Sequence, residues 1–239
     1  MRMSLRLDHY LSAAGLGSRS DVKKLIQKGL VMVNGVICKD SAFKVDETSA
    51  EVMLDEKAVT YKKNVYFMLN KPQGVISASR GDLRNPDEKC VIDLISEEKH
   101  RNLFPVGRLD RDTEGLLLIT DDGILAHNLL SPAKHVDKTY YAELRSELSE
   151  NERLKLEAGV DIGDDTLTLP SIVSKINKTS VHITIHEGRF HQIKRMFEAV
   201  GNEVIFLKRL SMGSLRLDDN LKPGEYRELT PEELAALVC

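Results

Sequence analysis

Apolar residues at helical spacing open the chain. Residues 5–14 and the segment after Ser18 each form one apolar helical face, made of Leu7, Leu11 and Ala14 in the first and of Val22, Leu25 and Ile26 in the second. Ser4 and Ser18 are the predicted N-caps, and Gly29 ends the second helix. Asn34-Gly35 lies between two short apolar runs and predicts a hairpin, because this pair accepts the positive φ angles of a two-residue turn.

Strand patterns dominate the chain from residue 65 onward. Short apolar runs predict strands at 65–69, 116–119, 138–144, 167–173, 180–185, 201–210 and 223–229. Helical spacing predicts helices at 91–95, 124–130 (with Ile124, Leu125 and Leu129 inward), 150–158, 189–200 and 231–238. Strands and helices do not alternate as a βαβ repeat, so the sequence predicts an α+β fold.

Composition and charge add domain boundaries and a local basic surface. An acidic stretch at 46–55 precedes a last short strand, which places a small domain at 1–60, a linker at 61–64 and a larger domain at 65–239. The net charge of −3 does not indicate nucleic-acid binding, but residues 1–28 carry six basic and two acidic side chains, a local charge of +4. No apolar run has the length of a membrane span or a signal segment, so we expect a soluble protein of the cytoplasm.

Neither the cysteines nor the histidines have the spacing of a metal site. Cys38, Cys90 and Cys239 are far apart, which fits free thiols in a reducing compartment. His186-Glu187 is followed by a histidine after five residues rather than four, and Gly188 interrupts the helix that a zinc protease requires. The sequence therefore predicts no metal and no cofactor.

A loop with three carboxylates and two guanidiniums precedes the strand at 116–119. Repulsion among Asp110, Asp112 and Glu114 must be offset by the neighbouring arginines or by a ligand. One interpretation is a solvated loop with capping aspartates, and another is an Asp-x-Asp pair that binds a divalent cation or begins an aspartyl phosphotransferase site. The phosphotransferase pattern requires threonine where Glu114 stands. A third interpretation is a reactive carboxylate on a rigid strand.

The segment 189–200 supplies a candidate partner for such a carboxylate. A helix beginning at Arg189 buries Phe190 and leaves Lys194 and Arg195 accessible. A cation in the first helical turn opposes the helix dipole unless an anion lies nearby. We therefore expect Arg189 to pair with Asp110.

Tyr140 is a candidate on the strand at 138–144. Strict alternation puts its side chain on the inner face with Ala142 and Leu144. A buried phenol needs a partner or a cleft, so Tyr140 is either a core tyrosine with a satisfied hydroxyl or a site residue.

Several motifs resemble those of known RNA-modifying enzymes. Gly107-Arg-Leu-Asp110 followed by Asp112-Thr-x-Gly-Leu-Leu-Leu118, together with Asn70-Lys-Pro-x-Gly74 and Glu187-Gly-Arg-x-His-Gln-Ile-Lys-Arg-Met196, resembles the ribosomal RNA pseudouridine synthases. Ser131-Pro-x-x-His-x-x-Lys-Thr-Tyr140 and Pro223-Gly-Glu-Tyr-Arg-x-Leu-Thr230 resemble the small-subunit (16S) branch of that family. The two N-terminal helices and the Asn34-Gly35 hairpin resemble an S4-type RNA-binding module.

The resemblance implies a fold, an activity and site roles. The fold is an S4-like αβ domain followed by a catalytic domain on a mixed, mainly antiparallel sheet. The activity is isomerisation of a uridine to pseudouridine, in which Asp110 is the catalytic carboxylate, Arg189 its partner, and Tyr140 packs against a flipped-out base. The expected RNA-binding residues are Arg6, Arg19, Lys23, Lys24, Lys28, Arg108, Lys194 and Arg195.

The resemblance also implies a partner and leaves alternatives open. The expected partner is ribosomal RNA or a partly assembled small ribosomal subunit, bound by a monomer without contact to a membrane. A large-subunit (23S) ribosomal RNA synthase is the first alternative. A catalytically silent RNA-binding protein of ribosome assembly is the second, and the joint presence of Asp110, Tyr140 and Arg189 disfavours it.

Overall fold

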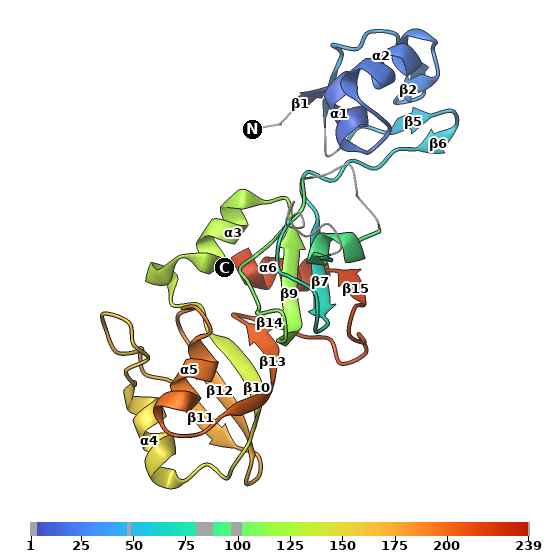
Figure 1. Cartoon of the computed structure of the whole chain (residues 1–239). Helices are drawn as coiled ribbons and strands as arrows, with labels where there is room; N and C mark the ends of the chain where they lie inside the picture. The colour runs from blue at the N-terminus through green and yellow to red at the C-terminus, as the bar shows by residue number, and fades with distance from the viewer. Residues whose placement is uncertain (1–3, 47–48, 80–87, 97–101, 239) are drawn as a thin grey trace. The chain divides into compact units, whose positions relative to one another are not determined.

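The structure, a computed structural model, describes residues 4–46, 49–79, 88–96 and 102–238, and its chain divides into two compact units (Figure 1). The first unit contains the described chain up to Val65, and the second begins at Tyr66. Tyr61 falls within the segment 61–64 that the sequence assigns to a linker, yet its ring stacks on Tyr10 with the centroids 5.1 Å apart.

The first unit packs two helices against short strands. Its elements are β1 (Ser4–Arg6), α1 (Leu7–Ala13), α2 (Arg19–Gln27), β2 (Val31–Val33), β3 (Val36–Ile37), β4 (Lys44–Asp46), β5 (Val52–Leu54) and β6 (Lys57–Ala58). One sheet has the order β3-β2-β5-β6, and β1 pairs with β4. The core contains Leu7, Leu11, Val22, Ile26 and Val31, each fully buried. Leu7, Leu11, Val22 and Ile26 of the predicted helical faces therefore lie in this core, whereas Ala14 and Leu25 are only half-buried and lie outside it.

Local signals in the first unit have mixed outcomes. Ser18 caps α2 in a reciprocal capping box with Asp21, as predicted. Asn34 and Gly35 have φ angles of 49° and 78°, which confirms the hairpin turn. The prediction of Ser4 as an N-cap is wrong, because Ser4 pairs with β4 in a strand and α1 begins after Arg6.

One mixed sheet forms the second unit. Its strands are β7 (Tyr66–Lys71), β8 (Phe104–Pro105), β9 (Glu114–Thr120), β10 (Lys138–Leu144), β11 (Ile172–Lys175), β12 (Ser180–Ile185), β13 (Val204–Met212), β14 (Leu215–Arg216) and β15 (Tyr226–Glu228). The order is β11-β12-β10-β13-β9-β7-β15, with β14 on β13 and β8 on β9. Among the described strands only β13 and β9 pair in parallel, which confirms a mainly antiparallel sheet.

The parallel contact between β9 and β13 depends on Gly115. Gly115 has a φ of 102°, and a Cβ atom there would lie 2.2 Å from the carbonyl oxygen of Arg209. A side chain cannot occupy that space, so glycine is required where the two strands meet. This contact brings the loop before β9 next to Arg209.

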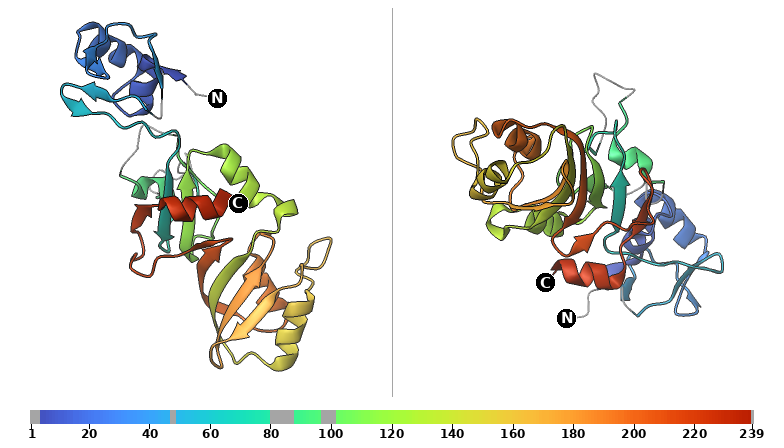
Figure 2. Two further views of the ribbon diagram at one scale, coloured as in Figure 1. Left: turned by 180° about the vertical axis from the view of Figure 1, so that it is seen from behind. Right: turned by 90° about the horizontal axis from the view of Figure 1, so that it is seen from below.

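Helices cover this sheet in two groups. The described helices are α3 (Gly123–Leu130), α4 (Glu150–Ala158), α5 (Gln192–Ala199) and α6 (Pro231–Val238), with short 3-10 turns η1 (Val91–Leu94) and η2 (Pro132–Lys134). α3 and α6 pack on the face of β7 and β9 that carries Met68 and Leu116 (Figure 2). α4 and α5 lie beside the half built from β10 to β12 (Figure 1). Of this second group, α5 borders the site.

Several boundaries in the second unit match the sequence prediction and others do not. β10, β12, α4 and α6 have the predicted bounds. The strand predicted at 167–173 begins only at Ile172. Ile124 was expected inward on its helix but is 79% exposed, because the helix faces the core with Leu125, Ala126 and Leu129.

Candidate active site

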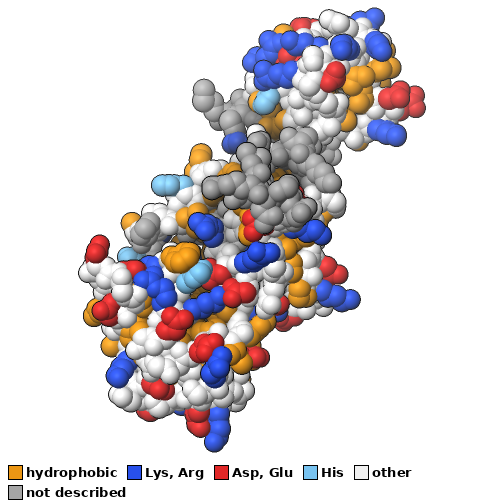
Figure 3. All heavy atoms as spheres, in the orientation of Figure 1, with side chains coloured by type: hydrophobic (Ala, Val, Ile, Leu, Met, Phe, Trp, Pro, Cys, Tyr) orange, Lys and Arg blue, Asp and Glu red, His pale blue; other side chains and the backbone are white. Residues whose placement is uncertain are grey.

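A cavity of about 460 Å³ opens in the second unit. It lies where the loop before β9 faces the segment that leads into α5. The buried residues that β10, β12 and β13 contribute to its lining, called the floor below, are Tyr140, Ile185, Leu207 and Arg209. Acidic, basic and histidine side chains gather on the face of this unit that Figure 3 shows. The volume is in the range of small-molecule sites.

The loop that carries Asp110 is held in place by Lys71. The Lys71 side chain is fully buried, and its Nζ donates hydrogen bonds to the carbonyl oxygens of Pro72, Asp110 and Thr113 at 3.0, 3.1 and 3.0 Å. Burial lowers the pKa of Lys71 from 10.5 to about 8. The Asn-Lys-Pro-x-Gly turn therefore fixes the backbone on which Asp110 stands.

A second contact holds the same loop from the other side. The Ser77 hydroxyl donates to the carbonyl oxygen of Leu109 at 2.8 Å and accepts from the Leu109 amide at 3.0 Å. Side chains on well-anchored backbone keep a defined direction. Asp110 is thus placed by contacts on both of its sides.

The Asp110 carboxylate faces two nitrogen-bearing side chains from the start of α5. Its Oδ2 lies 3.6 Å from Nζ of Lys194, and its Oδ1 lies 3.6 Å from Nε2 of His191. Lys194 also contacts Oδ1 of Asp112 at 2.5 Å, and this lowers the pKa of Asp112. Asp110 is 27% exposed, so its charge is partly removed from water.

The predicted pairing of Arg189 with Asp110 is wrong. Arg189 Nε donates to Glu187 at 2.9 Å, and its terminal nitrogens donate to the carbonyl oxygens of Thr166 and Leu167, both at 2.7 Å. Asp164 lies 3.5 Å from the same guanidinium. Arg189 lines the cavity, but all its contacts tie two neighbouring loops together.

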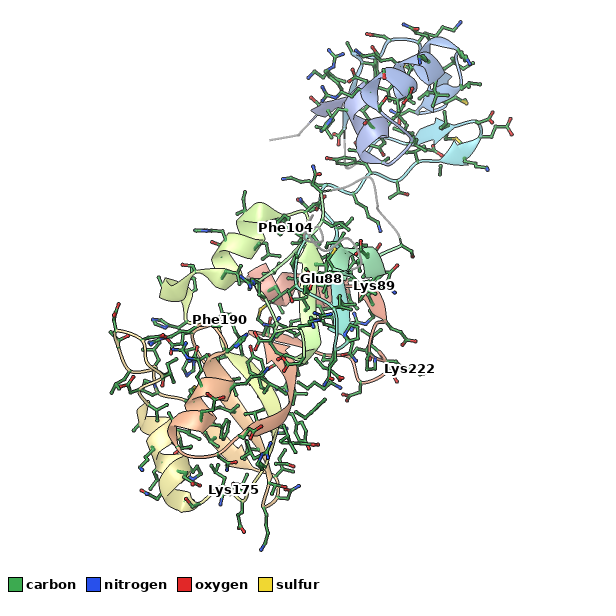
Figure 4. The ribbon with its side chains drawn as sticks, in the orientation of Figure 1. Glu88, Lys89, Phe104, Lys175, Phe190 and Lys222 are labelled. Carbon is green, nitrogen blue, oxygen red and sulfur yellow. The ribbon has the colours of Figure 1, made fainter. Side chains whose placement is uncertain are left out.

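The start of α5 explains this difference. The helix begins at Gln192 rather than at Arg189, because His191 has a left-handed backbone with a φ of 49°. Phe190 consequently points outward and is 69% exposed, where the sequence predicted burial (Figure 4). Its ring stacks on His191 with the centroids 3.8 Å apart. The cation in the first turn is Lys194, and the anions beside it are Asp110 and Asp112.

Tyr140 lies on the inner face of β10, as predicted. It is 7% exposed, lines the cavity, and lies opposite Ile183 of β12 and Arg209 of β13. Its ring thus forms part of the floor, and its contact with a substrate base stays a prediction.

The predicted RNA-binding residues fall into two groups. In the first unit Arg6 and Lys23 contact the buried Asp8 at 3.0 and 3.9 Å, Arg19 contacts His9, Lys24 contacts Asp21, and Lys28 is exposed. These cations lie on one small unit, and Figure 3 shows basic side chains gathered there.

The second group lies at the cavity, where the three residues differ in their contacts. Arg108 is exposed and has no ion pair within the described ranges, and Lys194 contacts Asp110. Arg195 instead binds Asp164 and the carbonyl oxygens of Ile162 and Phe190, which fixes the turn before α5. Of this group, Arg108 has the free charge that a phosphate contact needs.

Sequence reasoning missed Lys71, the pairing of Lys194 and the burial of Arg209. Lys71 directly follows a run of apolar strand residues, which is a signal that it continues the buried strand. The alternation of side chains along β13 could likewise have placed Arg209 on the same face as Leu207. Lys194 lies in the first turn of α5, so the dipole argument applies to it once the helix start is known.

The described part of the chain contains neither a metal-binding cluster nor a membrane-spanning helix. No group of three or more His, Cys, Asp or Glu side chains there could hold a metal ion. No helix of that part of the chain combines the length and apolar character needed to cross a membrane.

Comparisons with known proteins identify the family. Residues 65–199 match the RNA pseudouridylate synthase family, and residues 5–52 match the S4 domain. The chain is 49% identical to an uncharacterized RNA pseudouridine synthase of Bacillus subtilis over 98% of each chain. It is 39% identical to the ribosomal small subunit pseudouridine synthase A of Escherichia coli strain K12, over 98% of this chain and 100% of the relative.

A solved structure agrees with this assignment. The crystal structure of a pseudouridylate synthase matches with a TM-score of 0.68 and 36% identity, over 98% of this chain and 100% of the other. The chain therefore belongs to the RNA pseudouridine synthase family and carries an N-terminal S4 domain. It is an RNA pseudouridine synthase by family, which confirms the resemblance read from the motifs.

Proposed function

We propose that this enzyme converts one uridine of small-subunit ribosomal RNA to pseudouridine, with Asp110 as the catalytic carboxylate. The observation that carries the proposal is the position of Asp110, which stands on a fixed loop at a cavity whose floor contains Tyr140. The similarity to small-subunit synthases over nearly the full chain supports the choice of RNA.

The reaction places definite demands on the site. The N1–C1′ bond of uridine breaks, the base turns, a C1′–C5 bond forms, and a proton leaves C5 while another is gained at N1. No oxidation or external energy source is needed. A charged carboxylate beside the ribose and a cavity that retains the detached base are sufficient for such chemistry.

The described residues meet these demands. Asp110 stands at the cavity with its charge compensated by Lys194 at 3.6 Å. Tyr140 and the apolar residues Ile185 and Leu207 provide a surface against which a flat base packs. The dimensions fit a nucleotide that is rotated out of folded RNA, since a stacked uridine cannot reach a closed site.

RNA contacts are proposed for exposed cations at the cavity and on the S4 domain. Arg108 is exposed at the cavity and is proposed to contact the RNA next to the extruded uridine. Arg6, Arg19, Lys23, Lys24 and Lys28 of the S4 domain are proposed to bind phosphates, either of free RNA or of a partly assembled subunit. The names of the relatives favour the small subunit over the large-subunit alternative.

Mapping of pseudouridine in ribosomal RNA tests the proposal. A strain that lacks the gene is complemented with the wild type, with Asp110→Asn, or with Asp165→Asn, an exposed carboxylate outside the cavity lining. One small-subunit pseudouridine is expected to disappear in the deletion strain and to return with the wild type and Asp165→Asn only. Loss of a large-subunit site would select the alternative substrate, and an unchanged map would indicate a silent RNA-binding protein.

A further inference from the structure

Arg209 is a buried cation for which the described residues supply no counter-ion. It is 2% exposed on β13, and its Nε donates to the carbonyl oxygen of Leu116 at 2.7 Å. Its Nη2 is buried without a hydrogen-bond partner, and no carboxylate within the described ranges forms an ion pair with it. An unsatisfied buried guanidinium nitrogen is costly and needs an explanation. The hydrogen bond from Nε to Leu116 of β9 accounts for only one of the three guanidinium nitrogens.

The position of Arg209 indicates where its partner would come from. Arg209 lies directly opposite Tyr140 in the register of β10 and β13, so both side chains project from the same face into the cavity floor. Lys138, two residues before Tyr140, lines the same cavity and donates to the carbonyl oxygen of Val136 at 2.8 Å. Burial and the nearby charge of Arg209 lower the pKa of Lys138. Asp137 acts on the pKa of Lys138 in the opposite direction. Within the described structure neither Lys138 nor Arg209 forms an ion pair, so this part of the cavity carries positive charge.

The reaction creates a negative charge at this place. When the N1–C1′ bond breaks, its electron pair can leave with the base, and the resulting uracil anion shares the charge among N1, O2 and O4. Fixed cations aimed at developing charge lower the barrier most, because they need no reorganisation during the reaction. The floor also contains Ile185 and Leu207, which suit a flat ring better than a hydrated phosphate.

We propose that Arg209, assisted by Lys138, binds a carbonyl oxygen of the uracil ring and stabilises the ring as an anion after it leaves the ribose. The proposal rests on the proposed function. Both cations keep their protons: C1′ first loses N1 and then bonds to C5, the C5 proton passes to water, and N1 takes a proton from water. Arg209 therefore stabilises charge at the base, whereas Asp110 acts at the ribose.

Binding of free bases tests this charge preference without catalysis. Calorimetry compares uracil with 5-nitrouracil at a pH where only the nitro compound is ionised. The wild type is expected to bind the 5-nitrouracil anion about tenfold or more tightly than uracil, the difference that one charge-assisted hydrogen bond provides. Arg209→Met should abolish that preference, and Arg209→Lys should retain part of it because the charge remains.

The neighbouring Lys208 supplies a matched control. Lys208 precedes Arg209 on β13 and therefore projects from the other face of the sheet, outside the cavity lining. Lys208→Met removes the same unit of charge and is expected to keep the wild-type preference. If Arg209→Met does not fold, as judged by circular dichroism, Lys138→Met carries the test, because it leaves the Arg209 contact with Leu116 in place. Lys138→Met should reduce the preference severalfold.

Three results would overturn the inference. The wild type could show no preference for the anion, or the folded Arg209→Met variant could keep that preference. Alternatively, Arg209→Met could weaken the binding of uridine 5′-monophosphate relative to that of uridine, which would make the floor a phosphate site. The inference and the proposed function fail separately. An enzyme that modifies its uridine without anion preference contradicts the inference alone, and anion preference without any modified uridine contradicts the proposed function alone.

Discussion

Replacement of Lys71 by methionine tests how the Asp110 loop is held. Lys71 donates to the carbonyl oxygens of Pro72, Asp110 and Thr113 within 3.1 Å, and its side chain is fully buried. Methionine fills a similar volume but leaves these acceptors without a donor, at about 1 kcal/mol or more for each. The variant removes a buried charge at the same time, which offsets part of that cost. We expect a net loss of about 1–3 kcal/mol in the free energy of unfolding at pH 7.

The pH dependence of stability separates the two contributions. The folded-state pKa of about 8 lies below the ordinary 10.5 of lysine, so the unfolded state holds more protons between these values. Stability from this group therefore rises with pH between about 8 and 10.5, by up to about 3 kcal/mol, and is flat below pH 8. Urea unfolding of the wild type and of Lys71→Met at pH 7 to 10 measures the difference. Equal stability at pH 7 together with parallel pH profiles would refute the assignment of Lys71 as the buried support of the loop.

Two further variants separate charge from packing near the cavity. Lys194→Met should lower the rate of pseudouridine formation about tenfold or more, because Asp110 and Asp112 lose their shared cation. Lys194→Arg keeps the charge and should retain most of the activity. Equal single-turnover rates for the two variants would contradict the ion-pair role. Phe190→Ala should change the melting temperature little but weaken RNA binding about fivefold or more, since Phe190 is 69% exposed and exposed aromatics stack on bases. Ile205→Ala, at a residue 58% exposed outside the cavity lining, is the control, and equal RNA affinity of both variants would argue against a contact at Phe190.

Elements with a complete local signal could be predicted from the sequence. α4 combines helical spacing with the Ser149–Glu152 capping box, and α6 combines it with reciprocal hydrogen bonds between Thr230 and Glu233. Both helices have their predicted bounds because the determining contacts lie within four residues. The prediction of Ser4 as an N-cap is wrong for the opposite reason. The competing partner of Ser4 is strand β4, about forty residues away, which no local pattern reveals.

The candidate site was located by sequence, but its electrostatic contacts were not. Asp110, Tyr140 and Arg189 line one cavity. Their pairing depends on the residue at which α5 begins, and the left-handed backbone of His191 moves that start by three residues. Such a conformation is uncommon for residues other than glycine and depends on tertiary contacts. Because the helix begins three residues later, Arg189 lies outside it and contacts Glu187 and the carbonyl oxygens of Thr166 and Leu167. Lys194 lies in the first turn and reaches Asp110.

The site therefore controls the position of Asp110 and its charge through separate elements. Position comes from the turn after β7, where Lys71 binds the backbone of the loop and not its carboxylate. Charge compensation comes from α5, where Lys194 divides its contact between Asp110 and Asp112. Because Lys194 reaches both carboxylates, it can favour either one without any movement of the loop backbone. In the proposed reaction, Asp110 can thus exchange its ionic partner while the loop backbone stays fixed.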